Sequence, residues 1–268
     1  MRSKKGNKGW MAIKVDLEKA YDRLKWTFIK ETLIDIGFPS HLIELICSCI
    51  STTKMRLLWN GETLDEFRPT RGIRQGDPMS PYIFVLCLER LSHLIQAVVD
   101  NNFWKPIRLN KDGPVLSHLC FVDDLILFAE ANMEQADVIH RVLEVFCASS
   151  GQRVSKDKTR IFFSKNVGHN IRSEISDKLQ FARTEDLGKY LGVPTIHSRV
   201  TKNTYKEIES KLNARLNSWK ASSLSLAGRT TLVKSTLSSI PTYTMQSAIL
   251  SISTCNAIDR KCRNFHLG

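Results

Sequence analysis

The segment Cys120-Phe-Val-Asp123-Asp124-Leu-Ile-Leu-Phe-Ala129 places two adjacent aspartates between two apolar runs. Such runs on both sides of a polar dipeptide predict two buried strands joined by a turn at Asp123-Asp124. Alternating apolar and polar residues over Met11–Leu17 predict another strand, which carries Asp16 near its carboxyl end. We therefore expect carboxylates at the ends of buried strands.

Periodicity elsewhere in the chain predicts several helices and one hairpin. The hairpin centres on Asn60-Gly61, a dipeptide that suits the positive φ angles of a type I′ turn. The expected elements are helices over 25–36, 41–51 with Ser40 as cap, 78–101 and 132–151 with Asn132 and Gln135 as cap, and a hairpin over 54–67. From residue 151 onward we expect a helical, basic chain that is interrupted only at Tyr190–Pro194.

The chain is basic, with 39 Lys and Arg against 27 Asp and Glu and a formal net charge of +12. Residues 1–150 contain equal numbers of basic and acidic side chains, so the whole excess falls in residues 151–268. A basic block of this kind is typical of contact with a polyanion such as nucleic acid, although a solvated surface gives the same composition. The change in charge favours a domain boundary near residue 150, with a second candidate near Pro194.

The seven cysteines are odd in number and mostly lie in apolar runs. We expect them to be reduced core residues without a zinc site. The longest apolar runs, Leu42–Ile50 and Tyr82–Leu88, are too short to cross a bilayer, and the basic N-terminus lacks the apolar run of a secretion signal. We therefore expect a soluble intracellular protein with no membrane partner.

Carboxylates at buried strand ends predict a site for a hard divalent cation. Asp16, Asp123 and Asp124 would repel one another unless a cation or a proton intervened. Mg²⁺ binds one or two carboxylates together with substrate phosphates, and a pair of such ions supports nucleotidyl transfer. From the pattern alone a second interpretation stays open, in which Asp123-Asp124 is only a hairpin turn and Asp16 a helix cap.

Five segments in fixed order make the pattern more specific. They read KVDLEKAYDRLKW (14–26), RGIRQGDPMSP (71–81), FVDD (121–124), SGQRVSKDKT (150–159) and YLGVP (190–194). In order and spacing they resemble motifs A to E of reverse transcriptases from non-LTR (LINE-type) retrotransposons, especially those of plants. Trp219 and LSLAGR (224–229) resemble the helical thumb region that follows in these elements.

The resemblance implies an α+β polymerase palm, an antiparallel sheet backed by helices, over residues 1–194. A helical, basic and truncated thumb-like region would follow over 195–268. In this family the fingers strands and an endonuclease lie upstream of motif A, and only a short tail precedes Asp16 here, so we expect a palm and thumb fragment. The implied activity is RNA-directed DNA synthesis by two-metal nucleotidyl transfer, with two Mg²⁺ ions, for which Mn²⁺ could substitute. The implied partners are an RNA template, a DNA primer and dNTPs, and the implied location is the nucleus.

The resemblance also implies roles for single residues. Asp16 and Asp123 would bind the metals, and Asp124 would be a partial or outer ligand. Tyr21 would lie under the sugar and exclude a ribose 2′-hydroxyl, although an aromatic residue at this position could simply belong to the core. Lys158 would protonate the leaving pyrophosphate, with a plain exposed lysine as its alternative.

Motif B supplies the remaining predicted contacts. Gln75 and Gly76 would approach the incoming nucleotide, because glycine lets the backbone come close. Arg71 and Arg74 would touch a phosphate or the template, although both could equally be solvated surface side chains.

Two functions from different classes remain open. The first is a polymerase, and the second is a catalytically silent retrotransposon relic with residual nucleic-acid binding. A two-metal nuclease is a more distant alternative, because motif B and Tyr21 have no evident use in it.

Overall fold

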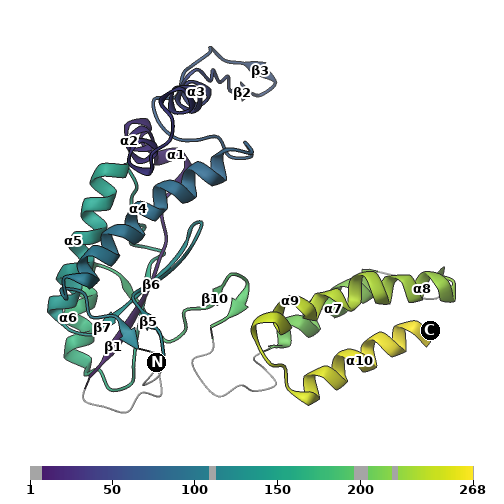
Figure 1. Cartoon of the computed structure of the whole chain (residues 1–268). Coiled ribbons are helices and arrows are strands. Elements are labelled where there is room, and N and C mark those ends of the chain that lie inside the picture. Colours follow the sequence, from purple (N-terminus) through teal and green to yellow (C-terminus); the bar gives the residue numbers. More distant parts are fainter. Residues whose placement is uncertain (1–7, 109–112, 196–204, 219–222, 268) are drawn as a thin grey trace. The chain divides into compact units, whose positions relative to one another are not determined.

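The computed structural model describes residues 8–108, 113–195, 205–218 and 223–267. The chain forms two compact units, Met1–Leu187 and Gly188–Gly268, and each has its own hydrophobic core. The first unit carries the main sheet, and the second is mostly helical (Figure 1).

A five-stranded sheet forms the centre of the first unit, in the order β6-β7-β1-β8-β9. Strand β1 lies in the middle and pairs antiparallel with both β7 and β8, whereas β9 pairs parallel with β8. The strands are β1 (Trp10–Val15), β6 (His118–Phe121), β7 (Asp124–Glu130), β8 (Arg160–Phe163) and β9 (Ala182–Thr184). Strand β1 thus lies beside the aspartate hairpin, with Val15 opposite Leu125 of β7.

Helices cover one face of this sheet (Figure 1). Alternation along β1 and β7 sends Met11, Ile13 and Leu127 to that face, where all three are fully buried in the core. The helices are α1 (Ala20–Arg23), α2 (Trp26–Ile36), α3 (Ser40–Ser51), α4 (Ser80–Asp100), α5 (Met133–Ser150) and α6 (His169–Leu179). The α+β class is confirmed, with the sheet backed by helices as expected.

Helix α4 is the longest element of the first unit. By length and composition alone it could cross a membrane, which corrects our expectation that no segment was long enough. Its residues Phe84, Leu91 and Ile95 are nevertheless buried in the core beside the sheet. This is the pattern of a core helix.

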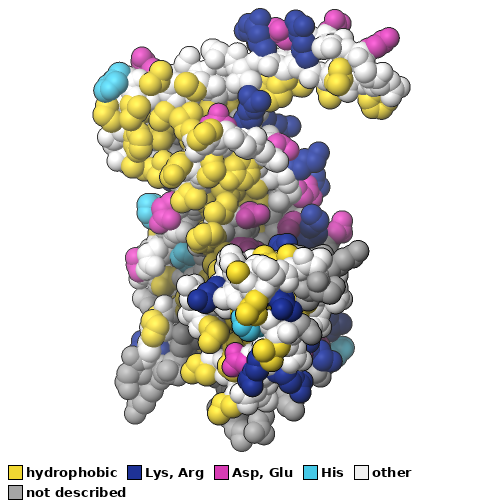
Figure 2. Space-filling model, turned by 90° about the vertical axis from the view of Figure 1, so that its right-hand side faces the viewer, with side chains coloured by type: hydrophobic (Ala, Val, Ile, Leu, Met, Phe, Trp, Pro, Cys, Tyr) yellow, Lys and Arg dark blue, Asp and Glu magenta, His cyan; other side chains and the backbone are white. Residues whose placement is uncertain are grey.

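Two small hairpins complete the first unit. They are β2 (Leu58–Trp59) with β3 (Glu62–Thr63), and β4 (Ile107–Arg108) with β5 (Val115–Leu116). Asn60 and Gly61 both have positive φ, so the type I′ signal gave the correct turn. The first hairpin and α3 expose large apolar side chains, among them Leu45, Leu58 and Trp59, and Figure 2 shows hydrophobic side chains on this part of the surface. These elements therefore contribute little to the core of the described part of the chain.

The second unit is built from helices. Its elements are β10 (Lys189–Tyr190), β11 (Val193–Pro194), α7 (Lys206–Ser218), α8 (Leu226–Leu232), the π-helical turn η3 (Val233–Leu237), α9 (Ser239–Ser247) and α10 (Ile252–Leu267). Leu212, Leu237 and Ile258 are among the buried residues of its core. The helical character expected for this region is confirmed, and the division between units falls between Leu187 and Gly188. Trp219 lies outside the described residues.

Three expectations about the sheet were wrong. Residues 151–187 are not simply helical, because β8 pairs with β1 inside the main sheet and β9 pairs with β8. The change in charge near residue 150 is therefore not a structural boundary. The turn of the aspartate hairpin comprises Val122 and Asp123, and Asp124 is already the first residue of β7. Strand β6 lies at the sheet edge, so Phe121 is 57% exposed rather than buried.

Two caps and the cysteines also differ from expectation. Pro39 rather than Ser40 precedes α3 as its cap residue, without a side-chain hydrogen bond. Asn132 caps α5 as expected, but the Gln135 side chain bonds the backbone of Phe103 and Lys105 instead of returning to the cap. Cys87 alone among the cysteines is buried, where burial raises the pKa of its thiol to about 12, and Cys49 is exposed.

Candidate active site

The carboxylates meet where β1 and β7 lie side by side. Opposed residues of an antiparallel pair project to the same face, and side chains alternate along each strand. Because Val15 lies opposite Leu125, the register places Asp16 and Asp124 on one face at the same end of the sheet. The Asp16 backbone is fixed there, since its N–H donates to Thr159 Oγ1 at 3.2 Å and its carbonyl accepts from the Ser155 N–H at 2.8 Å.

A lysine lies beside each of these two carboxylates. Lys158 Nζ is 3.9 Å from Asp16 Oδ1, and Lys14 Nζ is 3.9 Å from Asp124 Oδ1. The sequence predicted Lys158 for the site but not Lys14. Within the described residues, no three His, Cys, Asp or Glu side chains gather closely enough to hold a metal ion. The metal-binding roles of Asp16, Asp123 and Asp124 thus stay predictions, and the acidic residues are partly neutralised by lysines.

Asp123 lines a cavity together with Tyr21, the residue predicted to exclude a ribose 2′-hydroxyl. The cavity has a volume of 590 Å³, and its lining comprises Tyr21, Gln75, Gly76, Asp77, Pro78, Pro81 and Asp123. Removal from water raises the pKa of Tyr21 above its usual value, and the negative charge of Asp123 adds to that effect. The two side chains therefore share one electrostatic environment, in which Tyr21 stays neutral. Segments that are distant in the sequence form this single hollow.

Tyr21 also packs against α4. Its ring lies nearly parallel to that of Phe84, with centroids 4.9 Å apart and an interplanar angle of 12°. Phe84 is 1% exposed and belongs to the core, so it gives the Tyr21 ring a rigid support. The core alternative for Tyr21 is thus partly right, because the ring both packs on the core and lines the cavity.

Backbone contacts fix the short helix α1, which carries Tyr21, and the residues after it against the segment before α4. The Gly72 N–H donates to the Leu24 carbonyl at 2.7 Å, and the Ile73 N–H donates to the Tyr21 carbonyl at 2.9 Å. The Trp26 indole N–H donates to the Gly72 carbonyl at 2.7 Å. Gly72 has φ of 88°, and a Cβ there would lie 2.7 Å from the Asp22 carbonyl oxygen. Only glycine allows these two backbones to approach so closely.

The segment after α5 also contacts α1 and the residues that follow it. The Lys25 N–H donates to the Ser150 carbonyl at 2.9 Å, and the Gln152 side chain donates to the Ala20 carbonyl at 2.7 Å. Gly151 has φ of 80°, and a Cβ there would lie 2.7 Å from the Arg23 carbonyl oxygen. Hydrogen bonds and close backbone approaches at two glycines therefore fix the segments of motifs A, B and D to one another.

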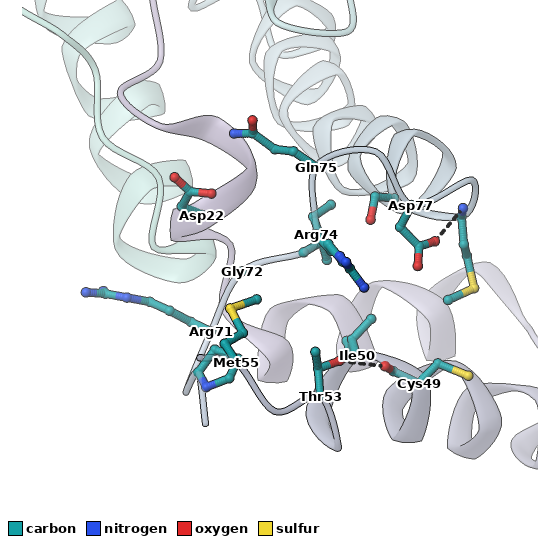
Figure 3. Close-up of a pocket in the computed structure, with 14 residues that line it drawn as sticks. Asp22, Cys49, Ile50, Thr53, Met55, Arg71, Gly72, Arg74, Gln75 and Asp77 are labelled. Carbon is teal, nitrogen blue, oxygen red and sulfur yellow. Dashed lines mark hydrogen bonds between the residues drawn. The ribbon is translucent and has the colours of Figure 1, made fainter. Parts of the chain in front are cut away.

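Arg71 and Arg74 lie in a neighbouring cavity instead of the one that contains Asp123. That cavity has a volume of 670 Å³, and Figure 3 shows Arg74 pointing toward Ile50 and Thr53. Gln75 and Asp77 line both cavities, so the segment before α4 forms a wall between them. The two arginines are exposed. The sequence placed these residues on one loop, and the structure shows that they line two different cavities. Their contacts with a nucleotide or a template stay predictions.

Sequence reasoning missed three contributors to the site. Lys14 could have been found from strand alternation, because it lies two residues before Asp16 and must share its face. Pro81 is the last residue of motif B and Phe84 follows it on α4, and only the three-dimensional packing shows which of the helix residues reach Tyr21 or the cavity.

Comparisons with known proteins agree with this geometry. The family described as reverse transcriptase (RNA-dependent DNA polymerase) matches residues 1–195. The chain is 27% identical over 210 residues to the Retrovirus-related Pol polyprotein from type-2 retrotransposable element R2DM of Drosophila melanogaster, a match that covers 74% of this chain and 19% of that protein. It is 24% identical over 211 residues to the Pol polyprotein of the R2 element of Popillia japonica, covering 76% of this chain and 34% of that protein. The chain thus spans a fifth to a third of these relatives.

One solved structure supports the fold. Telomerase from Candida tropicalis, in complex with a fragment of telomeric RNA, superposes with a TM-score of 0.50 at 15% identity. The superposition covers 95% of this chain and 38% of that one. At this identity the likeness concerns the fold alone.

Proposed function

The chain belongs to the reverse transcriptase family of non-LTR retrotransposons, and on that premise we propose that it catalyses RNA-directed DNA synthesis. One observation carries the proposal. Tyr21, Gln75, Gly76 and Asp123 line a single 590 Å³ cavity, beside the strand ends that bear Asp16 and Asp124. A cavity with an aromatic ring on one side suits the sugar of a nucleoside triphosphate, and a divalent cation would join its phosphates to the carboxylate.

Reverse transcriptases use divalent metal ions, and the acidic residues of this chain fit them. Carboxylate oxygens are hard ligands, and Mg²⁺ in such sites is held by one or two carboxylates plus the substrate phosphates. We propose that Asp16 and Asp123 hold two Mg²⁺ ions, for which Mn²⁺ can substitute, with Asp124 in an outer position. When bound, the metals lower the pKa of the primer 3′-hydroxyl and stabilise charge on the phosphates.

The other residues of the site would position and discriminate. The Tyr21 ring, supported by Phe84, would meet the sugar of the incoming nucleotide and leave no room for a 2′-hydroxyl. Gly76 has φ of 86°, which glycine adopts without strain, and it lines the cavity together with Gln75. Lys158, near Asp16, can donate a proton to the leaving pyrophosphate.

Nucleic acid is the expected partner of the basic side chains outside the cavity. We propose that the chain binds an RNA template and a DNA primer, with dNTPs as the small substrates. Exposed basic side chains of each unit, Arg71 and Arg74 in the first among them, would contact the phosphates. Each such contact would release counterions from the nucleic acid and so raise its affinity for the protein. A nuclear location accords with this proposal.

A silent nucleic-acid-binding protein is the second candidate function. The lysines beside Asp16 and Asp124, and the lack of a three-ligand cluster among the described residues, favour it. A chain of this kind would bind primer and template without extending the primer.

Primer extension separates the two candidates. The purified chain is given a DNA primer on an RNA template with dNTPs and Mg²⁺ or Mn²⁺, and Asp123→Asn serves as the matched control. We expect extension by the wild type and its loss in Asp123→Asn, with equal nucleic-acid binding by both proteins. Binding without extension would replace the polymerase by the silent alternative, and equal extension by Asp123→Asn would remove Asp123 from the site.

A further inference from the structure

Lys14 lies next to the acidic residues without a role in the proposed reaction. It precedes Asp16 by two residues on β1, and the Lys14 position is opposite Ile126 of β7. Asp124 is then its diagonal neighbour on the same face, at a separation that a long side chain can bridge. The bridge is present, with Lys14 Nζ 3.9 Å from Asp124 Oδ1 and the two side chains 30% and 37% exposed.

The backbone of Lys14 is more firmly held than that of the other lysine at the site. Lys14 lies in the central strand and pairs with residues of both β7 and β8. Lys158 lies in the turn before β8, where its side chain is 74% exposed. The Lys14 ammonium therefore has a defined reach, whereas Lys158 is free to move toward a substrate.

The basic residue nearest in the sheet does not compete for Asp124. Arg160 of β8 lies opposite Lys14, and its guanidinium is bound by the carbonyls of Asp157 and Thr159, the latter at 2.9 Å. Local backbone acceptors thus hold the Arg160 side chain in its own turn. Lys14, rather than Arg160, is therefore the basic residue of these strands that contacts Asp124.

We propose that Lys14 is a positioning residue that keeps Asp124 out of the metal shell, so that Asp16 and Asp123 alone bind the catalytic cations. This inference rests on the proposed function. Two carboxylates can serve two Mg²⁺ ions, because each ion also takes oxygens from the substrate phosphates. A fixed ammonium neutralises the third carboxylate and competes with the cation for its oxygen. Lys14 thereby sets how many carboxylates the site offers.

Metal affinity of the whole chain tests this inference without any need for polymerase activity. Mn²⁺ is titrated into the purified protein at constant pH and ionic strength, and free Mn²⁺ is followed by its electron paramagnetic resonance signal. The variants are Lys14→Met, Lys14→Arg, Asp124→Asn and the double variant Lys14→Met/Asp124→Asn. Lys178→Met is the matched control, because it removes a lysine that pairs with Asp137, an aspartate outside the site.

Lys14→Met should bind Mn²⁺ about three- to tenfold more tightly, since a positive charge about 4 Å from Asp124 is lost and the carboxylate is released. Lys14→Arg should keep the wild-type affinity. Asp124→Asn alone should change little, and the gain from Lys14→Met should disappear in the Asp124→Asn background. Thermal unfolding should be nearly unchanged, because a partly exposed ion pair adds little to stability.

The contrary results are equally definite. Unchanged or weaker Mn²⁺ binding by Lys14→Met would overturn the inference, and so would an equal gain with and without Asp124, which would show a general charge effect. Asp16→Asn and Asp123→Asn test the proposed metal site itself, and wild-type affinity in both would refute that site alone. If the wild type binds no Mn²⁺ but Lys14→Met does, Asp16 and Asp123 alone do not hold the cation, and the inference is refuted in the form given. If neither protein binds, the inference and the metal site are both refuted.

Discussion

Tyr21 and Phe84 stack face to face, with ring centroids 4.9 Å apart, and so connect the cavity beside Asp123 to the buried side of α4. The ring that would select the sugar is held by the core rather than by another residue of the site. Specificity at this position therefore depends on packing as well as on the aromatic ring itself.

The first prediction concerns Tyr21 directly. Tyr21→Val removes the ring from the cavity wall and should lower the preference for dNTPs over rNTPs by about tenfold or more. Tyr21→Phe is the matched control, which keeps the ring and loses only the hydroxyl. Ratios of kcat/KM for the two nucleotide classes measure the effect. Wild-type selectivity in Tyr21→Val would return Tyr21 to a purely structural role.

The second prediction concerns its support. Phe84→Leu should reduce the free energy of unfolding by about 1–3 kcal/mol, because it removes a stacked ring from a close-packed core. It should also lower sugar selectivity, since the Tyr21 ring gains freedom. In the Tyr21→Val background the selectivity effect of Phe84→Leu should vanish. An undiminished effect there would mean that Phe84 acts independently of Tyr21.

The third prediction compares two glycines. Gly72 and Gly61 have nearly the same φ, 88° and 87°, but only Gly72 has a neighbouring backbone where its Cβ would lie. Gly61→Ala should cost about 1–2 kcal/mol from backbone strain alone. Gly72→Ala adds a clash with Asp22 and should cost clearly more, as measured by urea unfolding. Equal costs would show that the Asp22 backbone in α1 moves away from the added Cβ without a cost in free energy.

The fourth prediction concerns pH. Burial lowers the pKa of His118 below its usual value, and the charge of Glu89 opposes this only in part. The unfolded chain therefore takes up a proton on His118 at a higher pH than the folded chain. Stability should fall as the pH drops below about 6.5. His118→Gln should flatten this decline in urea unfolding between pH 7.5 and 5.5, and an identical slope in both proteins would contradict it.

The strands beside the site followed from local sequence pattern, whereas the roles of its residues came from the resemblance to reverse transcriptases. Apolar runs and alternation located the strands next to Asp16 and Asp123, because burial of one strand face leaves a period of two. Strand β8 was missed, since a four-residue run such as Arg160–Phe163 has no clear period and its partner β1 is distant in sequence. Non-local pairing also decided which charges meet, so the contacts of Lys14 and Lys158 needed the fold.

The two cavities, and the residues that line each of them, could not be predicted from the sequence. The spacing of motif B placed Arg71, Arg74 and Gln75 on one loop, but not on which side of that loop each lies. That outcome depends on α3, which forms the far wall of the second cavity. The plant origin implied by the motifs stays a prediction.

The fifth prediction concerns the basic second unit. Arg260 and Arg263 are exposed on α10, and the double change to glutamine should weaken primer-template binding. If both contact phosphates, the slope of log K against log salt should fall by about 0.7–0.9 for each. Arg141→Gln on α5 is the control in the first unit. An unchanged slope in the double variant would make the charge on α10 a surface feature only.

Template-directed addition of a single nucleotide tests the central claim, that Asp16, Asp123 and the cavity of Tyr21 and Gln75 form one polymerase site. Each dNTP is offered alone against each templating ribonucleotide, to the wild type and to Asp123→Asn. The account predicts that only the complementary nucleotide is added, and that Asp123→Asn adds none while it still binds the primer-template. Addition that ignores the template, or that persists in Asp123→Asn, would contradict it.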